Sequence, residues 1–249
     1  MFGGSRPRYR FYPQERSAGA RVISVVKFLL LLFLVHQLVS TFLVTGYGVA
    51  SASMQPTLEP GDRLIVSSAP YGASMPLFGT RAPALGTPAR GDLVVVRTSY
   101  APRPPRLLYP VRSLVRFFTA GRLGGAEDDW RPEVTLRRIV AVPGDTVRMD
   151  EFIFYVRDAD SASFESEFEA SGIRYPLIRE GVPRDWSEDL PFASTMEEVE
   201  LGDGEYFLAS DNRIAGLDSR HRGPVAGEAL LSRVLLRYWP LSRFGVPRP

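Results

Sequence analysis

The chain has 249 residues with 45% apolar and 23% charged side chains, the ordinary balance of a protein that folds around an apolar core. Cysteine is absent, which excludes disulfides and thiolate metal sites, and only His36 and His221 could supply imidazole, so we expect neither metal nor cofactor. The net charge of +2 is too small to indicate a nucleic-acid partner. Lys27 is the only lysine.

The first predicted element is a membrane anchor over residues 22–45, a mostly apolar stretch long enough to span hydrocarbon as a helix. The tail before it, residues 1–21, carries five arginines and one acid. This bias predicts a single-pass protein of the cytoplasmic (inner) membrane with a cytoplasmic N-terminus, in contact with membrane lipid. A cleaved signal peptide is the alternative, because Ala50-Ser51-Ala52 resembles a cleavage site, but the long apolar run and long basic tail favour an anchor.

Residues 46–249 are predicted to form a mostly β extracytoplasmic domain with long loops. Short β-branched runs adjoin Gly-Asp turn signals, at Arg63–Val66, Leu93–Val96 and Arg138–Val142. Two segments elaborate this domain. Between Pro102 and Gly125 the apolar spacing predicts a short basic amphipathic helix, which either lies on an anionic membrane or packs on the β core. Residues 146–203 are predicted to be an acidic insert or cap subdomain.

Four short motifs follow the anchor in order. They are Ser51–Leu58 (SASMQPTL), Gly61–Gly72, Arg137–Asp145 (RRIVAVPGD), and Ser210–Arg213 with Asp218–Arg220. Together they resemble the conserved boxes of type I signal peptidases, and the resemblance covers most of the extracytoplasmic part. It implies a membrane-bound serine endopeptidase that removes signal peptides from exported proteins, which bind as an extended strand beside Val49 and Leu136.

The resemblance also assigns roles to individual residues. Ser53 matches the nucleophile and Ser51 the hydroxyl donor of the oxyanion hole. Five polar residues of the last box match the scaffold that shapes the site: Asp211, Asn212, Arg213, Asp218 and Arg220.

The general base departs from the family pattern. The family uses a buried, neutral lysine, but Arg137 occupies that position, and a guanidinium with a pKa of about 12.5–13.8 stays protonated. Gly216 stands where the family has the serine that orients the lysine, and Ser210 stands where it has glycine. These changes indicate relaxed or altered chemistry.

Three hypotheses follow. The chain is an active endopeptidase with an unusual base, for which His221 is the candidate although a structural role suits it better. Alternatively it is a non-catalytic binding protein or chaperone for exported chains. In the third, it is a subunit completed by the lysine of a catalytic paralogue, and the secretion translocon is a further possible partner.

Overall fold

The computed structural model describes residues 18–42, 45–72, 74–75, 80–81, 83–97, 134–179 and 194–247. The amphipathic helix expected between Pro102 and Gly125 and most of the basic tail lie outside these ranges.

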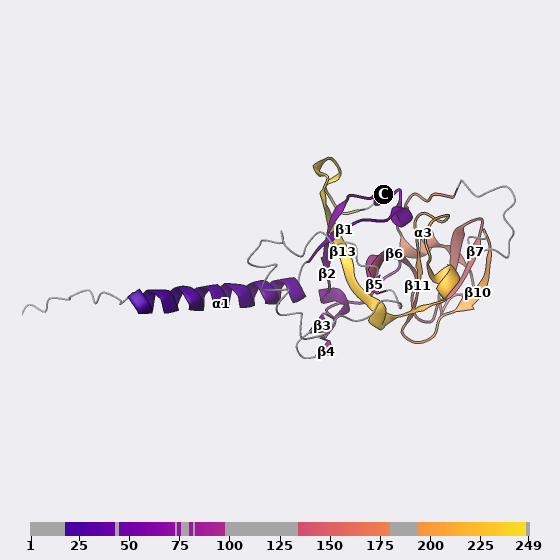
Figure 1. The fold of residues 1–249 in the computed structure, drawn as a ribbon. Helices are drawn as coiled ribbons and strands as arrows, with labels where there is room; N and C mark the ends of the chain where they lie inside the picture. Colours follow the sequence, from indigo (N-terminus) through magenta and orange to yellow (C-terminus); the bar gives the residue numbers. More distant parts are fainter. Residues whose placement is uncertain are drawn as a thin grey trace, which may run out of the picture.

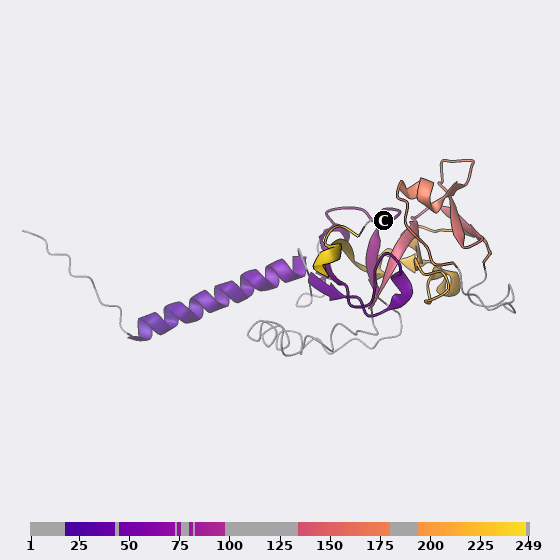
Figure 2. The same cartoon turned by 90° about the horizontal axis from the view of Figure 1, so that it is seen from above.

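The described part begins with a long helix, α1 (Ala18–Phe42), that extends away from a β domain (Figure 1, Figure 2). Its side chains from Val22 to Val35 are largely apolar and exposed, with Val22, Phe28 and Leu34 each 62% exposed. No helix in the described part of the chain has the length and apolarity needed to cross a membrane. The anchor over residues 22–45 therefore stays a prediction.

A seven-stranded antiparallel sheet forms the larger part of the β domain, in the order β1-β2-β13-β5-β6-β11-β12. Its strands are β1 (Thr45–Gly48), β2 (Arg63–Ser67), β5 (Leu93–Arg97), β6 (Val134–Ala141), β11 (Glu205–Ala209), β12 (Val225–Ala226) and β13 (Leu230–Trp239). The three runs predicted as strands correspond to β2, β5 and β6, and the expectation of a mostly β domain is confirmed.

A second sheet of four strands, in the order β10-β7-β8-β9, lies within residues 146–200. Its strands are β7 (Thr146–Asp150), β8 (Ile153–Arg157), β9 (Glu165–Ser166) and β10 (Met196–Glu200), and α3 (Glu167–Ser171) follows β9. Val147 and Phe154 of this sheet pack against Val140 of β6 and Phe207 of β11, so an apolar cluster joins the two sheets. The remaining elements are the short pair β3 (Ser74–Met75) and β4 (Thr80–Arg81), α4 (Ser219–Arg222), and the 3-10 turns η1 (Ala52–Met54), η2 (Ala69–Tyr71), η4 (Gly227–Ala229) and η5 (Leu241–Arg243).

Strand β6 positions the site because its side chains alternate between two faces. Leu136 belongs to a core cluster with Leu64, Val95 and Met54, whereas Ile139 belongs to another with Val94 and Leu208. The neighbours Arg137 and Arg138 are both buried, at 7% and 2% exposure, and they reach different partners.

Candidate active site

Ser53 lies in the turn η1, which the core holds in place. Met54, the last residue of the turn, is 1% exposed, and Leu58, which follows the turn, is 0% exposed. Ser53 itself is 5% exposed, and its backbone N–H donates to Ser51 Oγ at 3.2 Å. The Ser51 hydroxyl therefore lies beside the backbone N–H of Ser53, the two groups expected to serve an oxyanion.

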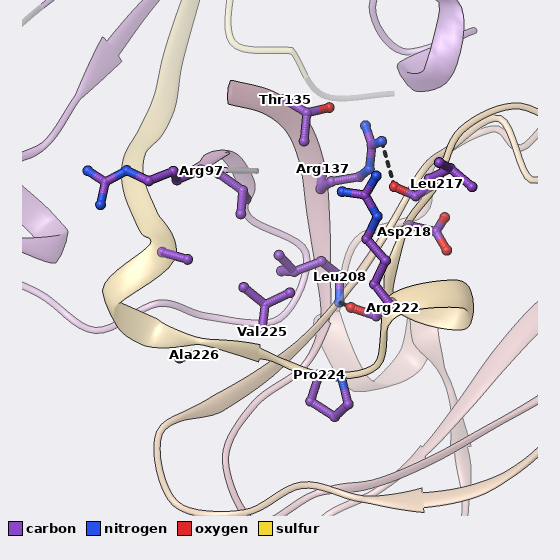
Figure 3. Close-up of a pocket in the computed structure, with 13 residues that line it drawn as sticks. Arg97, Thr135, Arg137, Leu208, Leu217, Asp218, Arg222, Pro224, Val225 and Ala226 are labelled. Atoms are coloured by element: carbon purple, nitrogen blue, oxygen red, sulfur yellow. Dashed lines mark hydrogen bonds between the residues drawn. The ribbon is translucent and has the colours of Figure 1, made fainter. Parts of the chain in front are cut away.

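Arg137 contacts the Ser53 hydroxyl directly. One guanidinium nitrogen, Nη1, donates to Ser53 Oγ at 3.0 Å and to the Leu136 carbonyl at 2.5 Å. The other, Nη2, donates to the Leu217 carbonyl at 2.9 Å (Figure 3). A guanidinium has no acceptor, so the Ser53 oxygen is the acceptor in this contact and its proton points elsewhere. The structure thus places a donor where a serine nucleophile needs a base.

Burial is the main influence on the pKa of Arg137. It lowers the pKa of the guanidinium, and Asp218 opposes that effect while Arg222 adds to it. A guanidinium is nevertheless effectively always protonated in proteins. Asp218 is itself engaged, because Arg220 donates to both of its oxygens at 2.9 Å and the Ser210 N–H donates at 2.9 Å. Burial raises the pKa of Asp218, but Arg220, the Ser210 N–H and the charge of Arg137 together outweigh it and hold the pKa below its usual value.

His221 lies on α4, with Nδ1 3.8 Å from an Asp218 oxygen. Burial lowers the pKa of its imidazole below the ordinary value, which favours the neutral form. The hydrogen bond at Ser53 Oγ comes from Arg137.

Gly216 has no room for a side chain. Its φ is +116°, a region that L-residues rarely adopt, and a Cβ added there would lie 2.8 Å from Ser210 Oγ and 3.0 Å from Ser53 Cβ. It would also lie 3.5 Å from Nη2 of Arg137. The Ser210 hydroxyl and the Ser53 side chain therefore crowd the volume that a serine at position 216 would use, while the Arg137 guanidinium lies at ordinary contact distance.

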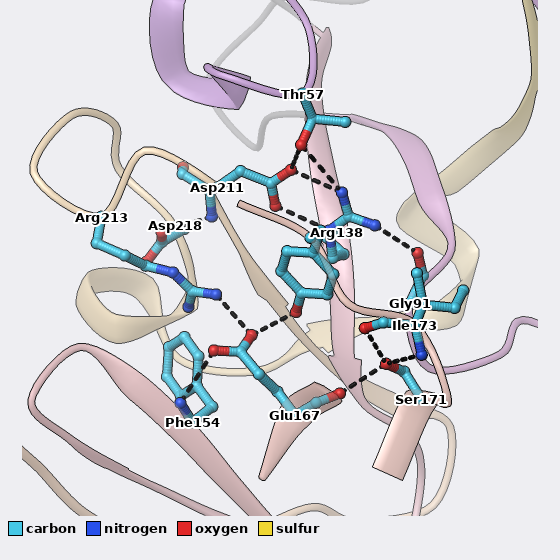
Figure 4. A network of polar contacts seen from close by, with 12 residues as sticks. Thr57, Gly91, Arg138, Phe154, Glu167, Ser171, Ile173, Asp211, Arg213 and Asp218 are labelled. Atoms are coloured by element: carbon cyan, nitrogen blue, oxygen red, sulfur yellow. Dashed lines mark hydrogen bonds and ion pairs between the residues drawn. The ribbon is translucent and has the colours of Figure 1, made fainter. Parts of the chain in front are cut away.

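Buried ion pairs hold the loop of the last box in place (Figure 4). Arg138 donates to both oxygens of Asp211, at 2.8 and 2.6 Å, and the Thr57 hydroxyl donates to Asp211 at 2.6 Å. The Asn212 N–H donates to the Ser53 carbonyl at 3.0 Å. Thus the loop containing Asp211 and Asn212 is bonded both to β6 and to the segment that carries Ser53.

A second buried pair joins this loop to the smaller sheet. Arg213 is fully buried and donates to Glu167 at 2.5 Å, and the Tyr175 hydroxyl donates to the same carboxylate. Sequence reasoning missed Glu167 and Tyr175, since a single acid in an acidic stretch carries no signal of burial. All nine predicted site residues are described. Ser51, Arg137 and Asn212 hydrogen-bond to Ser53. Asp211, Arg213, Asp218 and Arg220 are instead bonded to one another or to other scaffold residues. No group of three or more acids and histidines among the described residues is placed to hold a metal.

Comparison with known proteins gives consistent matches. A family model described as "Signal peptidase, peptidase S26" matches residues 22–239. The "Probable signal peptidase I-2" of Synechocystis is 24% identical over 208 residues, covering 84% of this chain and 69% of that protein. "Signal peptidase IB" of Staphylococcus aureus is 25% identical over 223 residues and 90% of each chain. A solved signal peptidase I from Enterococcus faecalis aligns with 60% of this chain and 98% of its own, at 17% identity and a TM-score of 0.32.

The crowding at Gly216 generates a stability prediction. Gly204 also has a positive φ, +72°, but nothing lies within 4 Å of an added Cβ, so Gly204→Ala is a control for a positive φ without crowding. We expect Gly204→Ala to lower the free energy of unfolding by about 1–2 kcal/mol. Gly216→Ala should lower it by about 1–3 kcal/mol more, because the added Cβ overpacks the site and because a φ of +116° lies outside the left-handed region.

A Ser210→Gly background removes the nearest clash and should recover most of that additional cost. Chemical denaturation in neutral detergent measures the free energy of unfolding of Gly204→Ala, Gly216→Ala, Ser210→Gly and the Ser210→Gly, Gly216→Ala double variant. Equal losses for Gly216→Ala and Gly204→Ala would show that position 216 has space, contrary to this description.

Proposed function

Because this chain belongs to the signal peptidase family, peptidase S26, we propose that it recognises the signal peptides of exported proteins with Ser53 facing the scissile bond. We further propose that Arg137 keeps cleavage by the isolated chain far below the rate of a serine–lysine enzyme.

The observation that carries this proposal is the hydrogen bond from Arg137 Nη1 to Ser53 Oγ. A serine hydroxyl becomes a competent nucleophile only when a neighbouring base accepts its proton. Arg137 can only donate, so it stabilises the serine oxygen as an acceptor and removes no proton. General-base catalysis typically raises the reaction rate by about 10²–10⁴-fold. We expect a loss of this size where arginine replaces the lysine base.

The remainder of the site supports peptide recognition. The Ser53 backbone N–H donates to the Ser51 hydroxyl in the structure, and both groups would turn toward the peptide carbonyl when a substrate binds. An extended signal peptide would lie beside the segments of Val49 and Leu136 and pair through its main chain. A role as a binding protein or chaperone for exported chains is the second candidate, and the same Arg137 contact favours it.

A subunit completed by a partner's lysine is less compatible with the geometry. Ser53 is 5% exposed, and the Arg137 guanidinium already occupies the approach to its hydroxyl. A lysine from a catalytic paralogue would have to displace this buried side chain. Contact with the secretion translocon would instead place the chain near emerging signal peptides without changing the site.

Attachment to the cytoplasmic membrane is part of the proposal. The support is that α1 exposes apolar side chains along its described length and follows a basic tail. Exposed apolar helices of this kind are stable when lipid covers them. The β domain would then lie outside the cytoplasm, next to the membrane.

Cleavage of a preprotein with an Ala-x-Ala site tests the catalytic part. We expect Arg137→Lys to raise the cleavage rate by at least ~100-fold over wild type, since a buried lysine can be neutral and accept a proton. Adding Ser53→Ala should abolish that gain, and Arg63→Lys, at an exposed position on β2, should leave the wild-type rate unchanged.

Binding of the uncleaved signal peptide, followed by fluorescence anisotropy, tests recognition separately. Wild type and Ser53→Ala should bind alike. A wild-type cleavage rate equal to that of Arg137→Lys would contradict the proposal that Arg137 suppresses the reactivity of Ser53. Absence of both binding and cleavage in every variant would contradict the proposed recognition of signal peptides.

Alkaline carbonate extraction of cell membranes tests the anchor. The full chain should stay in the membrane pellet. The double substitution Leu31→Arg with Leu34→Arg should release it, because each arginine costs roughly 2.5–3.5 kcal/mol at the centre of a membrane helix. The exposed change Ser24→Ala is the control. Release of the wild-type chain from the membrane pellet would contradict the proposed anchor.

A further inference from the structure

The buried arginines of the β domain differ in what neutralises their charge. Arg138 forms an ion pair with Asp211 at 2.6 Å, and Arg213 forms one with Glu167 at 2.5 Å. Arg137 is only 7% exposed, yet no carboxylate among the described residues forms an ion pair with it. Buried charges in proteins are normally paired. Arg137 is therefore a buried cation whose charge no acid in direct contact neutralises.

The groups that do contact this guanidinium are neutral. It donates to two backbone carbonyls, one of which is shown in Figure 3, and to Ser53 Oγ. Asp218 is the acid whose charge acts most strongly on Arg137, but Arg220 already donates to both oxygens of that carboxylate. A negative charge brought to Ser53 by a ligand would therefore be stabilised by Arg137.

Ser53 connects this charge to the site proposed for the peptide. Its Oγ accepts from Arg137 at 3.0 Å, so its own O–H proton points away from the guanidinium. The Ser53 N–H lies 3.2 Å from the Ser51 hydroxyl, and Ser51 is exposed. Three donors, two hydroxyls and one N–H, can thus turn toward a ligand with a cation behind them. A carboxylate, with two acceptor oxygens and a negative charge, fits such a set of donors.

The edge of β6 next to this site can take a peptide strand. Val134 to Arg138 pair with β5, whereas β11 pairs with β6 only from Arg138 onward. The second edge of the segment from Val134 to Arg137 is therefore unpaired with any described strand, and an extended peptide can add to it. A peptide that ends beside Ser53 would place its terminal carboxylate where a scissile carbonyl would otherwise lie.

Hydrolysis of a peptide bond changes the charge at exactly that position. An amide carbonyl is neutral, but the carboxylate that replaces it has a pKa of about 3.3–3.7 and is ionised at neutral pH. A neutral lysine at position 137 would offer this carboxylate no opposite charge. Arg137 does offer one, so the substitution that removes the base also favours the cleaved peptide over the uncleaved one.

We propose that the Ser53 site binds the free C-terminal carboxylate of signal peptides that another peptidase has already released. The carboxylate accepts hydrogen bonds from the Ser53 and Ser51 donors, and the charge of Arg137 stabilises it through the Ser53 hydroxyl. This inference rests on the proposed recognition of signal peptides and adds the chemical form of the ligand. The reaction that supplies the ligand is hydrolysis of a peptide bond by a different enzyme.

Fluorescence anisotropy with the full chain in neutral detergent tests the inference with three peptides labelled at the N-terminus. The first is a signal peptide that ends in Ala-x-Ala with a free carboxylate, the second is the same peptide with a C-terminal carboxamide, and the third continues past the cleavage position. We expect the free acid to bind at least ~10-fold more tightly than either of the others, because hydrogen bonds to a charged group are the stronger ones. Mass spectrometry after the titration verifies that the third peptide is intact.

Variants identify the source of this preference. In Arg137→Gln the ratio of the free-acid affinity to the carboxamide affinity should fall below ~3-fold, because the charge behind Ser53 is gone. Ser53→Ala should also lower the ratio by removing one donor. Both affinities are measured on the same variant, so a general loss of binding does not change the ratio. Arg63→Gln, at an exposed position on β2, is the control and should keep the wild-type ratio.

The possible outcomes separate this inference from the proposed function. Equal binding of the free acid and the carboxamide by wild type would overturn the inference, while recognition of signal peptides would stand because both peptides bind. A preference for the free acid that persists in Arg137→Gln would overturn it as well. Failure of wild type to bind any of the three peptides would contradict both proposals. If Arg137→Gln does not fold, the comparison of the three peptides on wild type still decides.

Discussion

The buried pair between Arg138 and Asp211 connects the parts from which the site is built. Arg138 comes from β6, Asp211 from the loop after β11, and the Thr57 hydroxyl that completes the pair follows the Ser53 turn. Neither charged side chain is more than 2% exposed. Breaking such a pair by removing one partner typically costs about 3–5 kcal/mol, because the other charge stays buried. This pair therefore holds Ser53 against β6, whatever residue occupies position 137.

The chemistry of the site then depends on the next residue along the same strand. With Arg138 committed to Asp211, Arg137 reaches Ser53 Oγ and the Leu217 carbonyl. The scaffold remains that of a nucleophilic serine with a buried partner, but the partner donates instead of accepting. Gly216 and Ser210 fit this change, since their neighbourhood has no space for a further side chain.

The β strands and the residues around Ser53 could be predicted from the sequence. The contacts that could not be predicted depend on how side chains pack in three dimensions. Alternating and β-branched runs indicate β2, β5 and β6, and the motif order brings Ser53 to Arg137. The crowding between Ser210 and Gly216 depends on side-chain positions that no local pattern encodes. The pairing of Glu167 with Arg213 joins residues far apart in the chain, and acidic composition conceals it. The α1 helix is present, whereas its crossing of a membrane remains a prediction.

The central claim is that Arg137 holds the Ser53 hydroxyl in a form that cannot attack. Its most direct test is covalent labelling of the full chain by a fluorophosphonate, followed by intact-protein mass spectrometry over time. Wild type should be labelled no faster than Ser53→Ala, while Arg137→Lys should gain one adduct that maps to Ser53. Rapid labelling of Ser53 in wild type would contradict the claim and require another base beside that hydroxyl.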